Sequence, residues 1–286
     1  MTERSNQSSQ EKLSDTNALK MPRAPRRRRN LYEPGVSENY RLSRSKIDLY
    51  MSCARCFFLD RRLGISRPPA YPLTLATAVD ELMKNEYDIY RKSQTPHPLM
   101  TEAGVDAVPY AHADLDVWRD SLRRGITYAV PGTPLVITGG IDDVWLNSDG
   151  KLHIVDYKST SKQGEVSIDA DWQIGYKRQL EIYQWLFRKN GFDVSDTAYF
   201  VYVNGDKNLP RFDNKIEFSS KIIPYEGNAS WVDQTIGKIL TTLNSSQLPD
   251  PDTSCKHCSY RMQASSIESW QPSQASHIKP WQHGTA

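Results

Sequence analysis

The sequence lacks any apolar run that approaches the roughly 18 residues a membrane-spanning helix needs. Its first 30 residues are polar and rich in arginine, without the apolar stretch of a secretory signal. It also lacks an internal repeat and the Gly-x-x-x-x-Gly-Lys-Ser/Thr loop of ATP-driven motors. We therefore expect a soluble, cytoplasmic protein that makes no contact with a membrane and works without an ATPase of its own.

A strong excess of either charge is also missing, since 36 Lys and Arg face 34 Asp and Glu, for a net charge of +2. Binding to nucleic acid must then depend on local patches of basic residues rather than on the net charge of the protein. Cysteine is scarce, but its four residues form two Cys-x-x-Cys pairs, which in a reducing compartment are more typical of metal or redox sites than of disulfides. They are Cys53, Cys56, Cys255 and Cys258.

Polar segments at both ends predict one central domain, at residues 39–262, between two disordered tails. Residues 1–38 are rich in Ser, Gln, Asn and charge, include the basic run 26–29 and show no apolar periodicity. That run could touch phosphates, although a solvated arm without a specific partner is the simpler interpretation. Residues 263–286 carry Ser, Gln, His and scattered Trp. What remains is long enough for one α/β core.

Within the domain, helical and strand patterns alternate. Helical spacing of apolar residues predicts helices at 43–59, 74–91, 114–124, 171–189 and 231–243. Runs rich in β-formers predict strands at 135–146, 151–160 and 198–204. The turn sequence at 147–150 should join the first two strands as an antiparallel hairpin.

Asp156 and Lys158 carry the strongest chemical signal, because alternation along a strand places both on one face. Asp142, in the partner strand of the predicted hairpin, could bring a second carboxylate to the same edge. Converging carboxylates suit Mg²⁺ or Mn²⁺, with the carbonyl of Tyr157 as a further ligand. A bound ion would activate water and polarise a phosphate, while Lys158 orients the nucleophile or offsets developing charge. An exposed Asp156–Lys158 ion pair is the competing interpretation, which the apolar neighbours disfavour.

Three motifs in this order resemble the PD-(D/E)XK nuclease superfamily, in particular its RecB/AddB-type exonuclease branch. They are the segment 139–142, which reads GGID, the segment 154–159, which reads IVDYKS, and the pair Gln179 and Tyr183. The resemblance implies an α/β (α+β) fold with a restriction-endonuclease-like mixed β-sheet core flanked by helices, and a metal at Asp142 and Asp156. Gln179 and Tyr183, one helical turn apart, would touch DNA or support the site. Alone, they also fit ordinary surface and core positions.

The chain departs from that branch at the early helix, where many members carry a histidine as an extra metal ligand. The matching place holds Asp80, whose carboxylate can serve Mg²⁺ or Mn²⁺ equally well. The competing interpretation is that Thr77 and Asp80 form a capping pair at a helix start. Glu86 and Asp88 are expected to be solvated.

The cysteines also depart, because iron-sulfur members use one Cys before the nuclease core and three after it, whereas this chain has two and two. By count, four thiolates suit a four-iron cluster or a tetrahedral Zn²⁺ equally. The resemblance favours the iron-sulfur cluster. Either metal would join the N- and C-terminal segments of the domain through the four-Cys site.

Basic residues beside the cysteines and on the helix predicted at 171–189 are candidates for DNA contacts, although each also fits a solvated rim. They are Arg55, Arg61, Arg62, Lys177 and Arg178. The expected function is a metal-dependent deoxyribonuclease, with an exonuclease on single strands or ends favoured, in DNA repair, recombination or defence. A helicase or another repair protein is a candidate partner. A catalytically inactive module that binds nucleic acid or a helicase is the alternative, and cleavage of RNA stays open.

Overall fold

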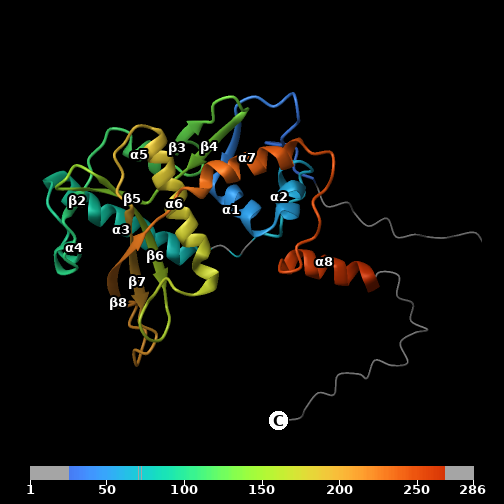
Figure 1. The fold of residues 1–286 in the computed structure, drawn as a ribbon. Helices are drawn as coiled ribbons and strands as arrows, with labels where there is room; N and C mark the ends of the chain where they lie inside the picture. The colour runs from blue at the N-terminus through green and yellow to red at the C-terminus, as the bar shows by residue number, and fades with distance from the viewer. Residues whose placement is uncertain (1–25, 70, 72, 268–286) are drawn as a thin grey trace, which may run out of the picture.

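The computed structural model describes residues 26–69, 71 and 73–267, which form two mixed sheets flanked by helices (Figure 1). The larger sheet has the order β2-β5-β6-β7-β8. Only β6 and β7 run parallel in it, which requires a crossover, and helix α6 supplies this crossover. The strands are β2 (Ala107–Pro109), β5 (Asp143–Asn147), β6 (Leu152–Thr160), β7 (Thr197–Gly205) and β8 (Phe218–Glu226). The α/β fold class expected from the sequence is thus confirmed.

The smaller sheet has the order β1-β4-β3. It consists of β1 (Tyr40–Ser43), β3 (Ile126–Ala129) and β4 (Leu135–Gly139). The short segment between β4 and β5 connects it to the larger sheet. The chain leaves β4 at Gly139 and enters β5 at Asp143, so the single strand predicted at 135–146 is in fact two strands in two sheets. Glycine is required at this crossing, because a Cβ on Gly139 would lie 2.6 Å from the Tyr183 ring and one on Gly140 would lie 2.3 Å from Ser121.

Helices cover both faces of the sheets. Helix α6, continuous with the short η1, packs against β3, β4 and β6, while α3 packs against the opposite face, on β2 and β6. Helices α1, α2 and α7 pack on one another beside α6 (Figure 1). The bounds are α1 (Arg44–Ser52), α2 (Ala54–Arg61), α3 (Thr74–Ser93), α4 (Pro98–Glu102), α5 (Leu115–Arg119), η1 (Asp171–Gln173), α6 (Ile174–Lys189), α7 (Trp231–Asn244) and α8 (Lys256–Ile267).

Strand β6 separates two apolar cores, and this fixes where its polar residues point. Ile154 belongs to the core beneath α6, whereas Val155 and Tyr157 belong to the core beneath α3. Because side chains alternate along a strand, Asp156 shares the face of Ile154 and points toward α6. A carboxylate is thereby buried on the side from which α6 can reach it.

The structure differs from the sequence predictions at several boundaries. The helix predicted at 43–59 is two helices, broken where Cys53 adopts an extended backbone. The helix predicted at 114–124 shrinks to α5, and α8 continues past the predicted domain end at 262. Residues 26–38, assigned to the tail, pack against the domain: Arg27 pairs with Asp60 at 3.0 Å, and Tyr32 is 2% exposed. The rest of the predicted tails, 1–25 and 268–286, lies outside the described residues.

Candidate active site and cysteine site

Asp156, Lys158 and Gln179 meet where β6 passes beneath α6. The Asp156 side chain is fully buried, and its Oδ1 accepts a hydrogen bond from Gln179 Nε2 at 2.7 Å. The Lys158 ammonium forms an ion pair with Oδ2, which has no other polar partner in the described part of the chain. Gln179 Nε2 also lies 3.4 Å from the Tyr183 hydroxyl, so both α6 residues singled out from the sequence reach this site.

Asp142 occupies the bend before β5 and turns toward the same place. Its Oδ2 accepts a hydrogen bond from the Tyr157 backbone N–H at 2.9 Å, and its Oδ1 lies 3.9 Å from Lys84 Nζ. Burial, followed by the charge of Asp156, raises the pKa of Asp142 to about 7. The charge of Asp156 therefore disfavours the ionisation of Asp142, as in sites where two carboxylates bind a cation between them.

Helix α3 adds Asp80 and Lys84, whose carboxylate and ammonium lie 2.6 Å apart. Burial, and then the charge of Asp142, raises the pKa of Asp80, which places this carboxylate within electrostatic reach of the site. The capping alternative is wrong, because α3 begins at Thr74 and the Thr77 hydroxyl donates to the Leu73 carbonyl at 3.2 Å. Lys84 was not among the residues predicted from the sequence, because its i,i+4 spacing from Asp80 indicates only an ion pair on one helix face.

Two further contacts set the charge around the pair of carboxylates. Lys158 Nζ lies 4.7 Å from the centre of the Tyr176 ring. Burial alone would lower the pKa of Lys158, but the charges of Asp156 and Asp142 raise it above its usual value. Arg44, at the start of α1, lies over the Tyr183 ring at 6.0 Å, and no local pattern in the sequence pointed to it.

The arrangement of oxygens fits a hard divalent cation. Each carboxylate has one oxygen held by a hydrogen bond, from Gln179 to Asp156 and from the Tyr157 N–H to Asp142. The second oxygen of each lies beside an ammonium, that of Lys158 or that of Lys84. Oxygens that are fixed in direction and surrounded by positive charge are the donors that Mg²⁺ and Mn²⁺ select. Asp142 and Asp156 would hold such an ion, with Asp80 and the Tyr157 carbonyl as further candidate ligands.

The neighbouring acidic residue Asp143 differs in that its charge is compensated by partners within the protein. It is fully buried, forms ion pairs with Arg91 and Arg119, and accepts a hydrogen bond from the Tyr157 hydroxyl at 2.7 Å. Asp88 also binds both arginines, and Glu86 lies 2.9 Å from His97. The expectation of a merely solvated residue is therefore wrong for Asp88, which helps to hold α3 in place through Arg119, whereas Glu86 is exposed as expected.

The basic residues proposed to contact DNA are partly engaged within the fold. Arg61 is 4% exposed and pairs with Asp60, so its assignment to a DNA-facing surface is wrong. The others are half-buried, each with a partner of its own. Arg55 donates to the Pro249 carbonyl, Arg62 donates to the Tyr32 carbonyl, Arg178 pairs with Asp48, and Lys177 lies over the Tyr225 ring.

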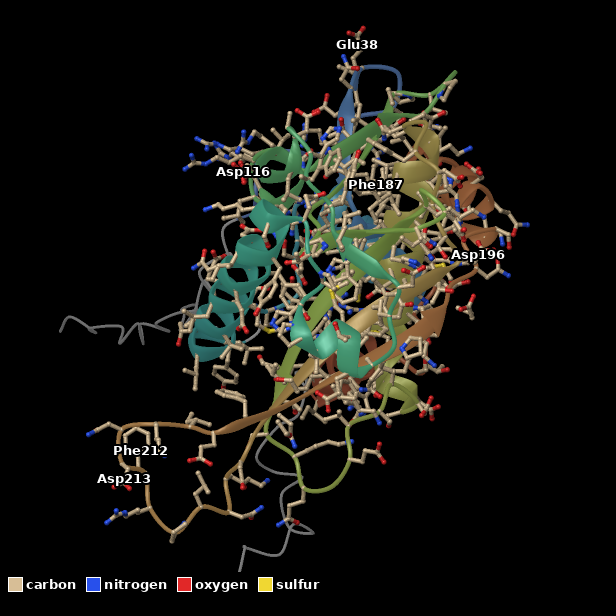
Figure 2. The ribbon with its side chains drawn as sticks, turned by 90° about the vertical axis from the view of Figure 1, so that its left-hand side faces the viewer. Glu38, Asp116, Phe187, Asp196, Phe212 and Asp213 are labelled. Atoms are coloured by element: carbon tan, nitrogen blue, oxygen red, sulfur yellow. The ribbon has the colours of Figure 1, made fainter. Side chains whose placement is uncertain are left out.

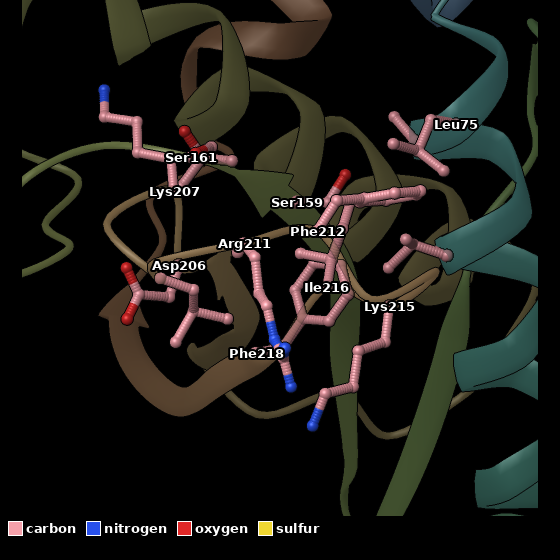
Figure 3. A pocket seen from close by; sticks show the side chains of 15 residues that line it. Leu75, Ser159, Ser161, Asp206, Lys207, Arg211, Phe212, Lys215, Ile216 and Phe218 are labelled. Carbon is pink, nitrogen blue, oxygen red and sulfur yellow. The ribbon is translucent and has the colours of Figure 1, made fainter.

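A cavity of about 530 Å³ opens where β6 continues past Lys158 (Figure 3). Its walls are the end of β6, the start of α3 and the loop between β7 and β8, which projects from the body of the protein (Figure 2). Phe212, near the tip of this loop, is 68% exposed. Its lining includes Ser159, Lys207, Arg211, Phe212, Lys215 and Phe218. Nothing in the local sequence pattern indicated this cavity.

The four cysteines form a single buried group, as the two Cys-x-x-Cys pairs predicted. Cys53 precedes α2 and Cys56 lies in its first turn, and Cys255 and Cys258 repeat this arrangement at α8. Their four sulfur atoms all lie within 4.8 Å of one another. Arg67 donates to Cys255 Sγ at 3.3 Å, and the Cys56 N–H donates to Cys53 Sγ at 3.4 Å. Buried thiols with N–H donors are a metal-binding donor set.

None of the helices among the described residues has the length and apolar character needed to cross a bilayer.

Comparison with known proteins gives one family. The family model described as the PD-(D/E)XK nuclease superfamily matches residues 86–263. Among solved structures, the one described as "Crystal structure of SSO0001" is 17% identical, with 76% of this chain and 91% of that chain covered and a TM-score of 0.26. LHK-Exo in complex with dAMP is 13% identical, with 78% and 88% covered and a TM-score of 0.28. No curated protein matches this chain significantly.

The family match spans more than half of the chain and includes the carboxylates and the lysine that meet at β6. Asp80 and the first cysteine pair precede the matched residues. On this match, the chain belongs to the PD-(D/E)XK nuclease superfamily.

Proposed function

We propose that the chain is a metal-dependent deoxyribonuclease whose active site is built from Asp142, Asp156 and Lys158. The observation that carries this proposal is the incomplete satisfaction of Asp156, a fully buried carboxylate beside a second one, with Lys158 as the only partner of its Oδ2 among the described residues. Two buried carboxylates held side by side oppose folding unless positive charge offsets them, so the arrangement is typical of a functional site. Superfamily membership supports the same conclusion.

Mg²⁺ or Mn²⁺ bound by Asp142 and Asp156 would lower the pKa of a coordinated water and polarise the scissile phosphate. The protein's own groups prepare the site. Gln179 fixes the orientation of Asp156 through Oδ1, and the Tyr157 N–H fixes that of Asp142 through Oδ2. Lys158 holds a positive charge beside Asp156, where it can offset charge that develops on the phosphate.

Single strands or ends are the proposed substrate, and the cavity beyond Lys158 supports this choice. Phe212 and Phe218 offer exposed rings on which unpaired bases can stack, and bases inside a duplex cannot reach such rings. Lys207, Arg211 and Lys215 line the same cavity and can contact phosphates. Arg211 and Lys215 form exposed pairs with neighbouring acids, which are weak enough to exchange for a phosphate.

A role for this nuclease in DNA repair, recombination or defence, with a helicase or another repair protein that supplies unwound strands, belongs to the same proposal. Its support is the resemblance of the three motifs to the RecB/AddB-type branch, together with the lack of a motor motif in the sequence.

The decisive assay incubates labelled single-stranded DNA, duplex DNA and RNA with Mg²⁺, Mn²⁺ or EDTA. We expect cleavage of single-stranded DNA that EDTA abolishes and that Asp156→Asn loses. Asp149→Asn is the matched control, because Asp149 is exposed in the turn between β5 and β6. Binding without cleavage in every metal would instead identify an inactive binding module, and preferential cleavage of RNA would overturn the substrate.

A further inference from the structure

The spacing of the four cysteine sulfurs distinguishes between the two metal groups that their number allows. Sγ of Cys53 lies 3.6 Å from that of Cys258, and Sγ of Cys56 lies 3.7 Å and 3.9 Å from those of Cys255 and Cys258. Each of these distances joins the N-terminal pair to the C-terminal pair. Both pairs therefore surround one point in space and do not face each other across a gap.

One tetrahedral ion requires this spacing. Four sulfurs at about 2.3 Å from a central Zn²⁺ lie roughly 3.8 Å from one another. These three distances fall within about 0.2 Å of that edge length, and all four sulfurs lie within 4.8 Å of one another. A disulfide does not explain the arrangement, because its sulfurs would be about 2.05 Å apart and would form two separate pairs.

A four-iron cluster does not fit the same positions. Each of its thiolates binds a different iron, so the cluster core separates the ligand sulfurs by roughly 6 Å. A two-iron cluster would keep two pairs close and hold the pairs apart by a similar distance. The close contacts here link all four sulfurs, Cys53 to Cys258, Cys258 to Cys56 and Cys56 to Cys255, so the sulfurs do not divide into two distant pairs in any combination. The cysteines therefore disagree with the iron-sulfur group that the RecB/AddB resemblance implies.

We propose that Cys53, Cys56, Cys255 and Cys258 bind a single Zn²⁺ that fastens α8 to the junction of α1 and α2. Helix α8 depends on this attachment, because Cys258 is its only buried residue. Its neighbours Tyr260 and Met262 are exposed. The ion is thus a structural metal ion that has no electron-transfer role and lies outside the proposed catalytic centre.

The first test is metal analysis of the full chain, produced in medium that contains both zinc and iron and purified without oxygen so that a cluster survives. We expect about one zinc per chain, no acid-labile sulfide and a colourless protein. Replacement by Co²⁺ should give the intense visible bands of a tetrahedral tetrathiolate site. About four irons with sulfide and an absorbance shoulder near roughly 400 nm would overturn the proposal. One iron without sulfide, or no metal together with no cobalt bands, would also overturn it.

A second test follows α8 itself in the wild-type protein, so it does not depend on the folding of a variant. Trypsin can cut after Arg261, an exposed residue of α8. Removal of zinc by a chelator should accelerate this cut severalfold and leave cuts elsewhere in the domain unchanged, and added Zn²⁺ should restore protection. Cys258→Ser should match the chelated protein, whereas the adjacent Ser259→Ala should match the untreated one. Cleavage after Arg261 that ignores zinc would contradict the fastening role.

Discussion

The acidic centre at Asp156 and the one at Asp143 are close in sequence and structure, yet their charges are balanced in opposite ways. Asp143 has two arginines and a tyrosine hydroxyl, so all of its charge is compensated within the protein. Asp156 has one ammonium and one amide, and a second carboxylate beside it. Both are fully buried, so burial alone does not identify a functional acid. The like charge of the neighbouring Asp142 does so.

The largest effect is expected on cleavage activity, in a variant of Asp156. Asp156→Asn should reduce cleavage by about 10³-fold, equivalent to about 4 kcal/mol, because it removes a metal ligand. Its free energy of unfolding should change far less than that of Asp143→Asn, because the loss of the ion pair with Lys158 is offset by removal of the like charge beside Asp142. The measurements are single-turnover cleavage and urea unfolding of the same preparation. A variant that loses stability as well as activity would show that Asp156 is structural.

The next largest effect is expected on stability, in the variant Asp143→Asn. This change leaves Arg91 and Arg119 without their buried partner, so we expect a loss of about 3 kcal/mol in the free energy of unfolding. Below the unfolding temperature, cleavage per folded molecule should change far less than in Asp156→Asn. Chemical denaturation gives the stability, and comparable losses of activity in the two variants would erase the distinction between the centres.

A third comparison uses Asp60, another carboxylate whose partners are all internal. Burial alone would raise its pKa, but hydrogen bonds from Lys46 and Ser66 and the charge of Arg61 lower the pKa to about 2. Because the folded pKa is below the unfolded one, this stabilisation is present above about pH 4 and is lost as the pH falls toward 2, for about 2 kcal/mol in total. The stability gap between wild type and Asp60→Asn should close over that range, and a constant gap would refute the assignment.

The smallest effect concerns the cavity beyond Lys158. Phe212→Ala should weaken binding of single-stranded DNA by about 1 kcal/mol, roughly fivefold, and leave duplex binding unchanged. Leu122→Ala is the matched control, because Leu122 is also an exposed apolar residue but lines a different cavity. Fluorescence anisotropy with short labelled strands is sufficient. Equal affinities for the two variants would remove the loop between β7 and β8 from the substrate path.

Local patterns predicted the elements that depend on local rules. The hairpin of β5 and β6 followed from a turn sequence between two β-rich runs, and α6 from its apolar spacing. The passage from β4 to β5 was not predictable, because contacts of Gly139 and Gly140 with distant residues decide it. Strand β8 was missed since its side chains are mostly exposed and it contains Pro224.

The same division holds for the sites. Motif spacing identified Asp142, Asp156, Lys158 and Gln179, which the structure brings together. Lys84 belongs to the surroundings only through tertiary proximity, which no local pattern carries. The number and spacing of the cysteines predicted a metal site but left zinc and iron-sulfur equal, because the choice depends on distances between sulfurs that are about 200 residues apart in the chain.

The central claim is that Asp142 and Asp156 together bind one divalent cation. Crystals soaked in Mn²⁺ and measured for anomalous scattering test it most directly. We expect a peak within about 2.3 Å of a carboxylate oxygen from each residue, and its loss in Asp156→Asn crystals. A peak that contacts neither carboxylate, or well-ordered carboxylates with no ion between them at saturating Mn²⁺, would contradict it.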